Sequence, residues 1–420
     1  MTTRQFIEEH LNDDIRELAL KYSNAKVDMA LALRQIEARQ LLRKKVPSWS
    51  DNPDLLFPAH LSVEQCSSEA TAQYKASLCH GDSFADLTGG LGVDCYFISQ
   101  KFKKIDYVEV KPELCEIAEN NFTSLRAKRS NLPKLDCFVA DAPRNDGDES
   151  IINIINESSE AYLSHCEPKD CFFIDPARRD QYGRKTVSIA DCTPNVIELQ
   201  DLLLQKARRV MVKLSPMLDI TKALGELRHV GEVHVVAVAN ECKELLFILE
   251  QGFEGETEIT CVNLQTEQPA VKYRHCEQSE AIQPDSNWIA SSLSLLAMTV
   301  QTYLYEPNAA LMKAGCFGLL SQRYGIQQLH RNSHLYTSEQ LVADFPGRIF
   351  KVEGWAPYNK RIKQTLLADV TKASIATRNF PLSVVELRKA LKIADGDEVY
   401  LFATTIGNEQ KVIIYTHKAR

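Results

Sequence analysis

Two periodicities of apolar residues divide the chain. Over the first fifty residues, apolar side chains recur at the spacing of an α-helix, at Leu11, Ile15, Leu18, Tyr22, Met29, Leu33 and Ile36. No proline or glycine interrupts this pattern before Pro47, which opens a turn-rich stretch. The pattern predicts a helical amino-terminal extension over residues 1–60.

From residue 84 onward, short apolar runs alternate with amphipathic stretches. Strands are predicted at 84–88, 105–110, 135–140, 171–175, 210–214 and 233–238, and helices at 93–102, 112–122, 194–207 and 218–229. This alternation favours right-handed crossovers and a parallel sheet. A seventh run, 245–250, follows too closely for a crossover helix and must pair antiparallel. Residues 61–265 are therefore predicted to form an α/β domain with a seven-stranded, doubly wound, Rossmann-like sheet whose last strand is antiparallel.

Residues 266–330 are predicted to form an α+β linker module. A strand is expected at 302–305 and a helix at 309–324. The segment 273–300 has no clean period and resembles the translation of an interspersed genomic repeat, as does 125–132. We expect a surface insertion there, because long loop insertions cost little free energy. One ordinary surface helix is the alternative.

Residues 331–420 are predicted to form a compact, basic α+β domain. Strands are expected at 399–403 and 412–415, and a helix is expected to begin at Ser383, where Glu386 completes a capping box. These ninety residues carry a net charge of +5, whereas the other 330 carry −12. A basic module on an acidic body favours a polyanionic partner, although solvated surfaces also show such a bias.

Composition limits the classes of protein to which the chain can belong. Its 420 residues are 44% hydrophobic and 25% charged, which is typical of globular proteins. No apolar run approaches the roughly 18 residues of a membrane span, and the amino terminus lacks a signal-peptide pattern, so we expect a cytoplasmic protein. The twelve cysteines contain no Cys-x-x-Cys pair. We therefore expect neither a metal site nor disulfides.

The strongest chemical signal is a glycine-rich turn after the first predicted strand. Gly89, Gly90 and Gly92 lie between two acids, Asp86 and Asp94. Glycines let the backbone approach a ligand, and a helix amino terminus offers free N–H groups, so the turn is predicted to bind a nucleotide. The third glycine of the dinucleotide fingerprint and the Gly-Lys-Ser/Thr of a phosphate loop are both absent. A carboxylate here repels pyrophosphate but suits an ammonium group, which S-adenosylmethionine carries.

Two further acids stand at the ends of the next predicted strands. Glu109 ends the second strand, where an acid can accept hydrogen bonds from ribose hydroxyls. Asp141 follows the predicted third strand, where a carboxylate can accept the adenine amino group. One such acid alone would indicate only a solvated strand end, but four at matching places predict a cofactor site. The predicted cofactor-binding set is Asp86, Thr88, Gly89, Gly90, Gly92, Asp94, Glu109 and Asp141.

These motifs resemble those of class I S-adenosylmethionine-dependent methyltransferases over residues 84–250. The whole chain is more narrowly similar to bacterial methyltransferases with a carboxy-terminal THUMP-like domain, through the segments 64–71, 175–179, 213–217 and 377–381. The resemblance implies S-adenosylmethionine as the cofactor. It also implies RNA as the substrate, because THUMP domains of related enzymes bind RNA.

The segment after the fourth predicted strand lies where the resemblance places the transferable methyl group. Methylases of exocyclic amines carry Asp/Asn-Pro-Pro-aromatic there, whereas this chain keeps Asp175 and Pro176 but continues with Ala177 and Arg178. The ring that would stack on a flipped base is therefore missing locally. The segment also resembles one in RNA 5-methyluridine enzymes, but their downstream cysteine motif is absent. Two loosely placed thiols are expected to be packed or idle, Cys192 and Cys242.

Lysine and arginine side chains complete the predicted acceptor site. Lys213 lies in an otherwise apolar strand, where a charge is costly unless it is paired. Asp175 on the neighbouring strand is the expected partner, and snorkelling of Lys213 to the sheet edge is the alternative. We assign catalytic roles to Asp175, Pro176 and Lys213. Arg178 and Arg179 are predicted to bind substrate phosphate, with solvated loop arginines as the alternative.

The predicted function is an S-adenosylmethionine-dependent methyltransferase that acts on RNA. In the terminal domain, Arg378 and Phe380 join a cation to an aromatic ring and are predicted to contact a phosphate and a base. The alternative is that Phe380 belongs to the core. Two other functions stay open: a methyltransferase of small molecules or proteins, and a non-catalytic RNA-binding adaptor that keeps the fold.

Overall fold

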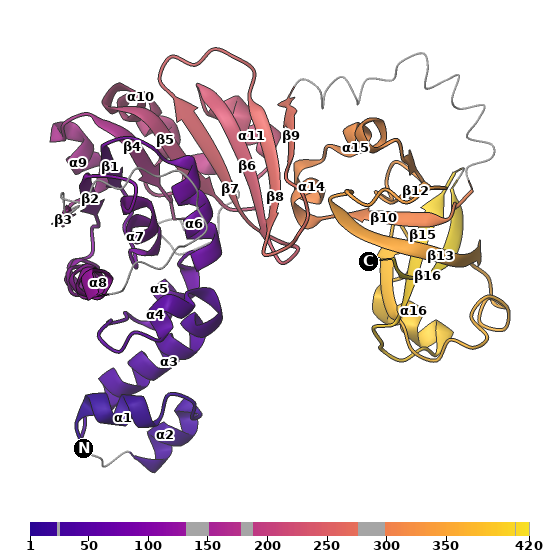
Figure 1. The fold of residues 1–420 in the computed structure, drawn as a ribbon, viewed down its shortest axis with the longest axis horizontal. Coiled ribbons are helices and arrows are strands. Elements are labelled where there is room, and N and C mark those ends of the chain that lie inside the picture. The colour runs from indigo at the N-terminus through magenta and orange to yellow at the C-terminus, as the bar shows by residue number, and fades with distance from the viewer. Residues whose placement is uncertain (23–25, 132–150, 178–187, 276–298, 408, 420) are drawn as a thin grey trace. The chain divides into compact units, whose positions relative to one another are not determined.

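The computed structural model describes all residues except 23–25, 132–150, 178–187, 276–298, 408 and 420 (Figure 1). The described chain divides into two compact units. The first comprises Met1–Gly231 and Leu246–Glu254, and the second comprises Glu232–Leu245 and Gly255–Arg420.

The first unit opens with the predicted helical extension. Its helices are α1 (Thr3–Glu9), α2 (Ile15–Lys21), α3 (Met29–Lys45), α4 (Pro47–Ser50), α5 (His60–Gln65) and α6 (Glu69–Leu78). Polar side chains start several of them, because Asp14, Asp28 and Ser68 accept hydrogen bonds from the first-turn amides of α2, α3 and α6. A small core between α1, α2 and α3 buries the apolar residues Phe6, Leu18, Ala32 and Ile36.

Residues 83–274 contribute a nine-stranded sheet, in the order β3-β2-β1-β4-β5-β7-β6-β8-β9, of which β8, β9 and most of β6 belong to the second unit. The strands are β1 (Ser83–Asp86), β2 (Lys104–Val108), β3 (Ile151–Ile155), β4 (Lys169–Ile174), β5 (Ala207–Leu214), β6 (Val230–Val238), β7 (Glu241–Glu250), β8 (Glu258–Leu264) and β9 (Val271–Arg274). The pairs β1–β2, β2–β3, β1–β4 and β4–β5 are parallel. The first seven strands confirm the predicted doubly wound α/β sheet, and β8 and β9 extend it.

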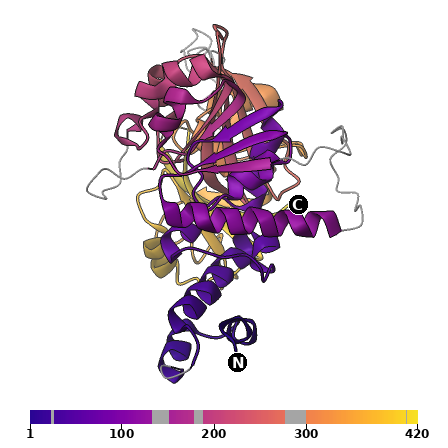
Figure 2. The same ribbon diagram turned by 90° about the vertical axis from the view of Figure 1, so that its left-hand side faces the viewer.

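Helices connect the parallel strands. They are α7 (Val93–Ser99), α8 (Pro112–Asn131), α9 (Ser159–His165), α10 (Val196–Lys206) and α11 (Ile220–Glu226), with a short 3₁₀ turn, η1, at Ile189–Asp191. Figure 2 shows the strands of this part side by side and α8 as a long helix beside them. β1 is buried at three of its four residues, as expected of a central parallel strand covered on both faces.

The third described strand was not among the strands predicted. β3 is Ile151–Ile155, a run of four isoleucines around Asn153, and it pairs with β2 in parallel register. The β-branched side chains of this run suit a strand. The predicted strand at 135–140 and Asp141 lie outside the described residues. The described residue that follows β3 is Asn156, whose Nδ2 donates to the carbonyl of Glu109 at 2.8 Å.

The second unit contains a seven-stranded sheet in the order β11-β12-β10-β13-β16-β15-β14. Its strands are β10 (Tyr303–Pro307), β11 (Gln327–Gln328), β12 (Tyr336–Ser338), β13 (Gly347–Pro357), β14 (Ser374–Arg378), β15 (Val399–Ile406) and β16 (Gln410–Lys418). All neighbours are antiparallel except β14 and β15, which are parallel.

The structure has three helices in the described part of the second unit where the sequence predicted two, because one predicted helix is divided. The predicted helix at 309–324 is divided into α14 (Ala309–Ala314) and α15 (Phe317–Tyr324), because Gly315 takes a left-handed conformation with φ 75° between them. The third is α16 (Val384–Leu391), whose capping box between Ser383 and Glu386 is present as predicted. Of the expected insertion at 273–300, residues 276–298 lie outside the described part.

Candidate active site

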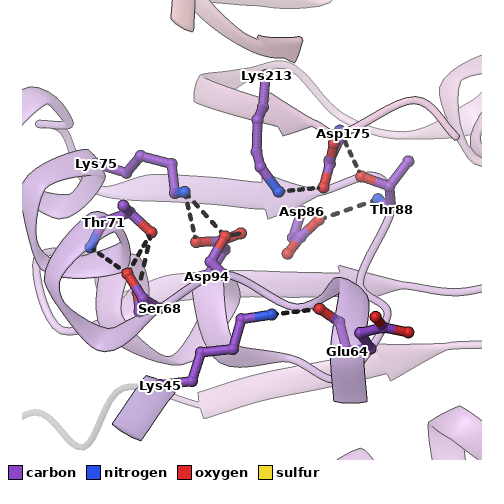
Figure 3. Close-up of polar contacts among 11 residues, drawn as sticks. Lys45, Glu64, Ser68, Thr71, Lys75, Asp86, Thr88, Asp94, Asp175 and Lys213 are labelled. Atoms are coloured by element: carbon purple, nitrogen blue, oxygen red, sulfur yellow. Dashed lines mark hydrogen bonds and ion pairs between the residues drawn. The ribbon is translucent and has the colours of Figure 1, made fainter. Parts of the chain in front are cut away.

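The candidate site lies at the carboxyl ends of three adjacent parallel strands. β1 ends at Asp86, and the register of β4 and β5 pairs Ile174 with Val212. The next residues along these two strands, Asp175 and Lys213, therefore stand side by side. Figure 3 shows both side chains close to Asp86 and Thr88. In open parallel sheets the carboxyl ends of strands are where ligands bind.

Glycine is required at two places in the turn between β1 and α7. A Cβ on Gly89 would lie 2.2 Å from the ring of Tyr107, which is wholly buried. Gly92 has φ 84° and is the N-cap of α7, and a Cβ there would meet the Phe122 ring at 2.8 Å. The turn is thus pressed against the sheet and α8 in a way that only glycine allows.

Glu109 fixes the conformation of this turn. Its carboxylate accepts hydrogen bonds from the backbone N–H groups of Gly90 and Lys111, both at 2.9 Å. The Tyr107 hydroxyl donates to the Gly90 carbonyl at 2.6 Å. Glu109 therefore stands at the predicted strand end and touches the predicted glycine turn.

Asp86 is, with Glu109, one of two buried acids of the site for which the described residues supply no cation partner. It is 1% exposed, and its Oδ1 accepts a hydrogen bond from the Thr88 backbone at 3.0 Å. Burial raises the pKa of Asp86 well above its ordinary value, and the nearby charges of Asp94, Asp175 and Glu109 raise it further. A ligand cation placed here would relieve both effects.

Asp94 is held by a lysine and a serine that sequence reasoning missed. Lys75, wholly buried on α6, places its Nζ 3.1 Å from Oδ1 of Asp94 and 3.0 Å from Oγ of Ser67. Ser67 donates to Oδ2 of Asp94 at 2.6 Å. Burial alone would raise the pKa of Asp94, but Lys75, Lys213 and Ser67 bring it below the ordinary value. Both carboxylate oxygens are thus engaged by the protein, and Asp94 joins α6 to α7 (Figure 3).

Asp175 and Lys213 form the pair expected between neighbouring strands. Nζ of Lys213 lies 2.5 Å from Oδ2 of Asp175, and the two side chains are 13% and 38% exposed. The backbone N–H of Asp175 donates to Oγ1 of Thr88 at 2.7 Å. Thr88 therefore contacts both strand-end acids, one through its amide and one through its hydroxyl. Pro176 is buried, and Ala177 is exposed and pairs through its backbone with Thr193.

Three described cysteines bear on whether the protein has a nucleophilic thiol: Cys66, Cys192 and Cys242. Cys66 lies between α5 and α6, and burial raises the pKa of its thiol to about 11. Burial also raises the pKa of Cys242 to about 11. Cys192 is 3% exposed and donates to the Ser188 carbonyl at 3.5 Å. Neither Cys66 nor Cys242 has the lowered pKa that marks a nucleophilic cysteine.

The predicted substrate residues fall in two different settings. Arg178 and Arg179 lie outside the described residues. In the second unit, Arg378 is paired at 2.8 Å with Glu306, which is 3% exposed and also binds Arg348. The Phe380 ring packs against a buried apolar cluster and lies edge-on to Tyr358, with ring centroids 5.2 Å apart. This packing is the core position that was the alternative for Phe380.

Two negative observations apply to the described part of the chain. It contains no group of three or more His, Cys, Asp or Glu side chains that could hold a metal ion. Among the described helices, none combines the length and apolar character that crossing a membrane demands.

Comparisons with known proteins found family models that match the carboxy-terminal part of the chain and a solved structure that matches all of it. Family models match a ferredoxin-like domain at residues 303–346 and a THUMP domain-like segment at residues 347–418. The structure solved as "putative methyltransferase from Porphyromonas gingivalis W83" is 32% identical, with a TM-score of 0.81 over 100% of this chain and 98% of that chain. The search among curated proteins found no match.

Two further solved structures resemble less than half of this chain. One is an rRNA methylase from Streptococcus thermophilus, 14% identical over 43% of this chain and 93% of that chain, with a TM-score of 0.28. The other is a "putative methyltransferase from streptococcus mutans in complex with SAH", 13% identical over 44% of this chain and 96% of that chain, with a TM-score of 0.30.

Proposed function

Because this chain belongs to the family of class I methyltransferases with a carboxy-terminal THUMP-like domain, we propose that it is an S-adenosylmethionine-dependent methyltransferase acting on RNA. The observation that carries the choice of cofactor is the charge around Asp86. Two of the site's acids have lysine partners, Asp94 with Lys75 and Asp175 with Lys213. Asp86 has none among the described residues, and other carboxylates surround it.

The donor set fits the proposed cofactor. Asp86 would hold the ammonium group, the backbone of the glycine turn would lie against the nucleoside, and Glu109 would accept from the ribose hydroxyls. Glu109 accepts two backbone hydrogen bonds, and its oxygens keep further lone pairs for such a contact. A dinucleotide fits poorly, since its pyrophosphate would meet Asp86 and Asp94 instead of cations. When bound, the cofactor supplies a methyl group on a positively charged sulfur.

RNA is supported as the substrate by the terminal part of the chain. Residues 331–420 carry a net charge of +5, and residues 347–418 match a THUMP domain-like family model. Methyl transfer needs chiefly the positioning of an acceptor close to the methyl carbon, so a separate domain that captures RNA suits the chemistry.

Isothermal titration with S-adenosylhomocysteine tests the cofactor assignment. We expect one site per chain, with an affinity at least tenfold weaker in Asp86→Asn, because the amide keeps the shape of the carboxylate but removes its charge. Asp170→Asn is a matched control, since Asp170 is a hydrogen-bonded acid at the opposite end of the same sheet. Binding of NAD in preference to S-adenosylhomocysteine would overturn the proposal.

A filter-binding titration with RNA at low salt tests the substrate assignment. The full chain should bind RNA, and the affinity should fall steeply as salt rises because phosphate contacts release counterions. Absence of RNA binding in a protein that binds S-adenosylhomocysteine would leave a methyltransferase of another substrate.

A further inference from the structure

The Asp175–Lys213 pair bears on which atom receives the methyl group. Asp175 follows β4 and Lys213 lies near the end of β5, on the side of the sheet where the glycine turn begins. Oδ2 of Asp175 is held by the ammonium of Lys213 at 2.5 Å. Among the described residues, no donor reaches the second oxygen, Oδ1, and 38% of the side chain is exposed. One carboxylate oxygen of Asp175 is therefore open to an approaching group, next to the ammonium of Lys213.

An amino group is a poor match for this pair. An amine gains positive charge as it is methylated, and the adjacent ammonium of Lys213 opposes that charge. An exocyclic amine also presents two protons, whereas one of the two carboxylate oxygens of Asp175 is already occupied. The two residues after Pro176 are Ala177 and Arg178, so the aromatic ring on which a flipped base would stack is missing at that place in the motif.

A base carbon is an equally poor match. Methylation at pyrimidine carbon 5 needs a thiolate that first adds to the ring. Of the described thiols, Cys66 is the one whose charge environment includes both Lys213 and Asp94, yet its pKa of about 11 keeps it protonated at neutral pH. The described part of the site thus lacks the nucleophile that this chemistry requires.

A hydroxyl group fits both members of the pair. Its proton can be accepted by Oδ1 of Asp175, and its oxygen gains negative character that the Lys213 ammonium stabilises. Thr88 holds the acid in place, because its Oγ1 accepts the Asp175 backbone N–H at 2.7 Å. In RNA, the hydroxyl present at every nucleotide is the ribose 2′-OH.

We propose that the acceptor is the 2′-hydroxyl of an RNA ribose, with Asp175 as the proton acceptor and Lys213 as the charge stabiliser. This inference rests on the proposed function. The 2′ oxygen forms a C–O bond to the methyl carbon as the C–S bond breaks, and the electron pair of that bond returns to sulfur. The hydroxyl proton passes to Oδ1 of Asp175 and then to water.

Alkaline hydrolysis of the product tests the acceptor atom. The purified full chain is incubated with methyl-labelled S-adenosylmethionine and RNA from cells in which the gene is deleted. A 2′-O-methyl group removes the nucleophile of alkaline cleavage, so the label should appear in alkali-resistant dinucleotides. Label released in mononucleotides would show base methylation and overturn this inference while leaving the proposed function intact. RNA that takes up no label, with S-adenosylhomocysteine still bound, would overturn the RNA assignment itself.

Variants of Lys213 test the second role. Lys213→Met should lower the rate of RNA methylation at least 100-fold while the affinity for S-adenosylhomocysteine stays within threefold. Lys213→Arg keeps the charge and should retain more activity than Lys213→Met. The matched control is Lys169→Met, because Lys169 pairs with Asp106 at the same 2.5 Å but at the opposite end of β4. Equal losses of activity in Lys169→Met and Lys213→Met would assign Lys213 a structural role and overturn the proposal.

Discussion

The buried Lys75–Asp94 pair should be among the most important polar contacts for the stability of the first unit. Replacing Lys75 with Met removes the ammonium and leaves the Asp94 carboxylate, which is 9% exposed, without its cation. At 3.1 Å and an effective dielectric constant of about 20, the Coulomb attraction lost is about 5 kcal/mol. Because desolvation of the lysine is also relieved, we expect Lys75→Met to lower the free energy of unfolding by about 3–5 kcal/mol.

Urea denaturation at pH 7, followed by tryptophan fluorescence, measures this loss. Lys103→Met is the control, since Lys103 and Asp82 are also 3.1 Å apart but 51% and 74% exposed, and it should cost under about 1 kcal/mol. The double variant Lys75→Met, Asp94→Leu should recover part of the loss, because no buried charge is left unpaired. Equal effects of Lys75→Met and Lys103→Met would refute this reasoning.

The pH dependence of the same pair gives an independent check. The folded-state pKa of Asp94 lies below its ordinary value, so the stabilisation from its ionised form is fully present at neutral pH. It should be lost as the pH falls through the folded-state pKa. In Lys75→Met, the lysine that lowers the pKa of Asp94 is gone while burial still raises that pKa, so the pKa of Asp94 should rise. The difference in unfolding free energy between the variant and the wild type should then narrow from pH 7 to pH 5.

The remaining predictions concern the glycine turn, the terminal sheet and the cofactor acid. Gly89→Ala should abolish S-adenosylhomocysteine binding and lower the melting temperature, since its Cβ would lie 2.2 Å from a buried ring. Gly90→Ala meets only the strain of φ 55° and should lower the free energy of unfolding by about 1–2 kcal/mol. Equal losses of stability in the two variants would contradict this reasoning. Arg378→Glu should destabilise the second unit in urea more than Arg378→Met, because it sets a carboxylate against buried Glu306. Calorimetry in buffers of different ionisation enthalpy should show proton release when S-adenosylhomocysteine binds near the pKa of Asp86, and none in Asp86→Asn.

The parts of the site that could be predicted from sequence are those set by local patterns. Asp86 and Glu109 end apolar strands, and the glycines between them mark a turn, so their meeting follows from the parallel arrangement alone. The same logic joins Asp175 to Lys213, because a lysine in a buried strand needs a partner on a neighbouring strand.

The third strand shows where local pattern fails. Two apolar runs follow α8, at 135–140 and at Ile151–Ile155, and either has the length of a strand. Which of them pairs with β2 depends on the length of chain that the crossover requires and on side-chain packing. The spacing of apolar residues along the chain indicates neither of these. Asp141 and the run at 135–140 lie outside the described residues, and so the adenine contact of Asp141 stays a prediction.

Lys75 could not be predicted because its partners lie far away in sequence. Ser67 precedes the helix that carries Lys75, and Asp94 belongs to the next helix, beyond β1. Its only local signal is that it shares a face with the buried residues Thr71, Ala72 and Ala76. A lysine on a buried face requires an acid, but the sequence offers several acids, and only the packing of α6 against α7 selects Asp94.

The pairing of charges explains why Asp86, rather than Asp94 or Asp175, should be the anchor for the cofactor's ammonium group. An acid already paired with a lysine gains little from a ligand cation, because its charge is neutralised before the ligand arrives. Asp94 and Asp175 are in that state, and the two lysines responsible come from α6 and β5. Asp86 lies between them with a raised pKa and a single backbone hydrogen bond. On the proposed function, the lysines would thus divide these three acids by role: Asp94 joins α6 to α7, Asp175 would face the acceptor, and Asp86 would bind the ammonium group of the cofactor.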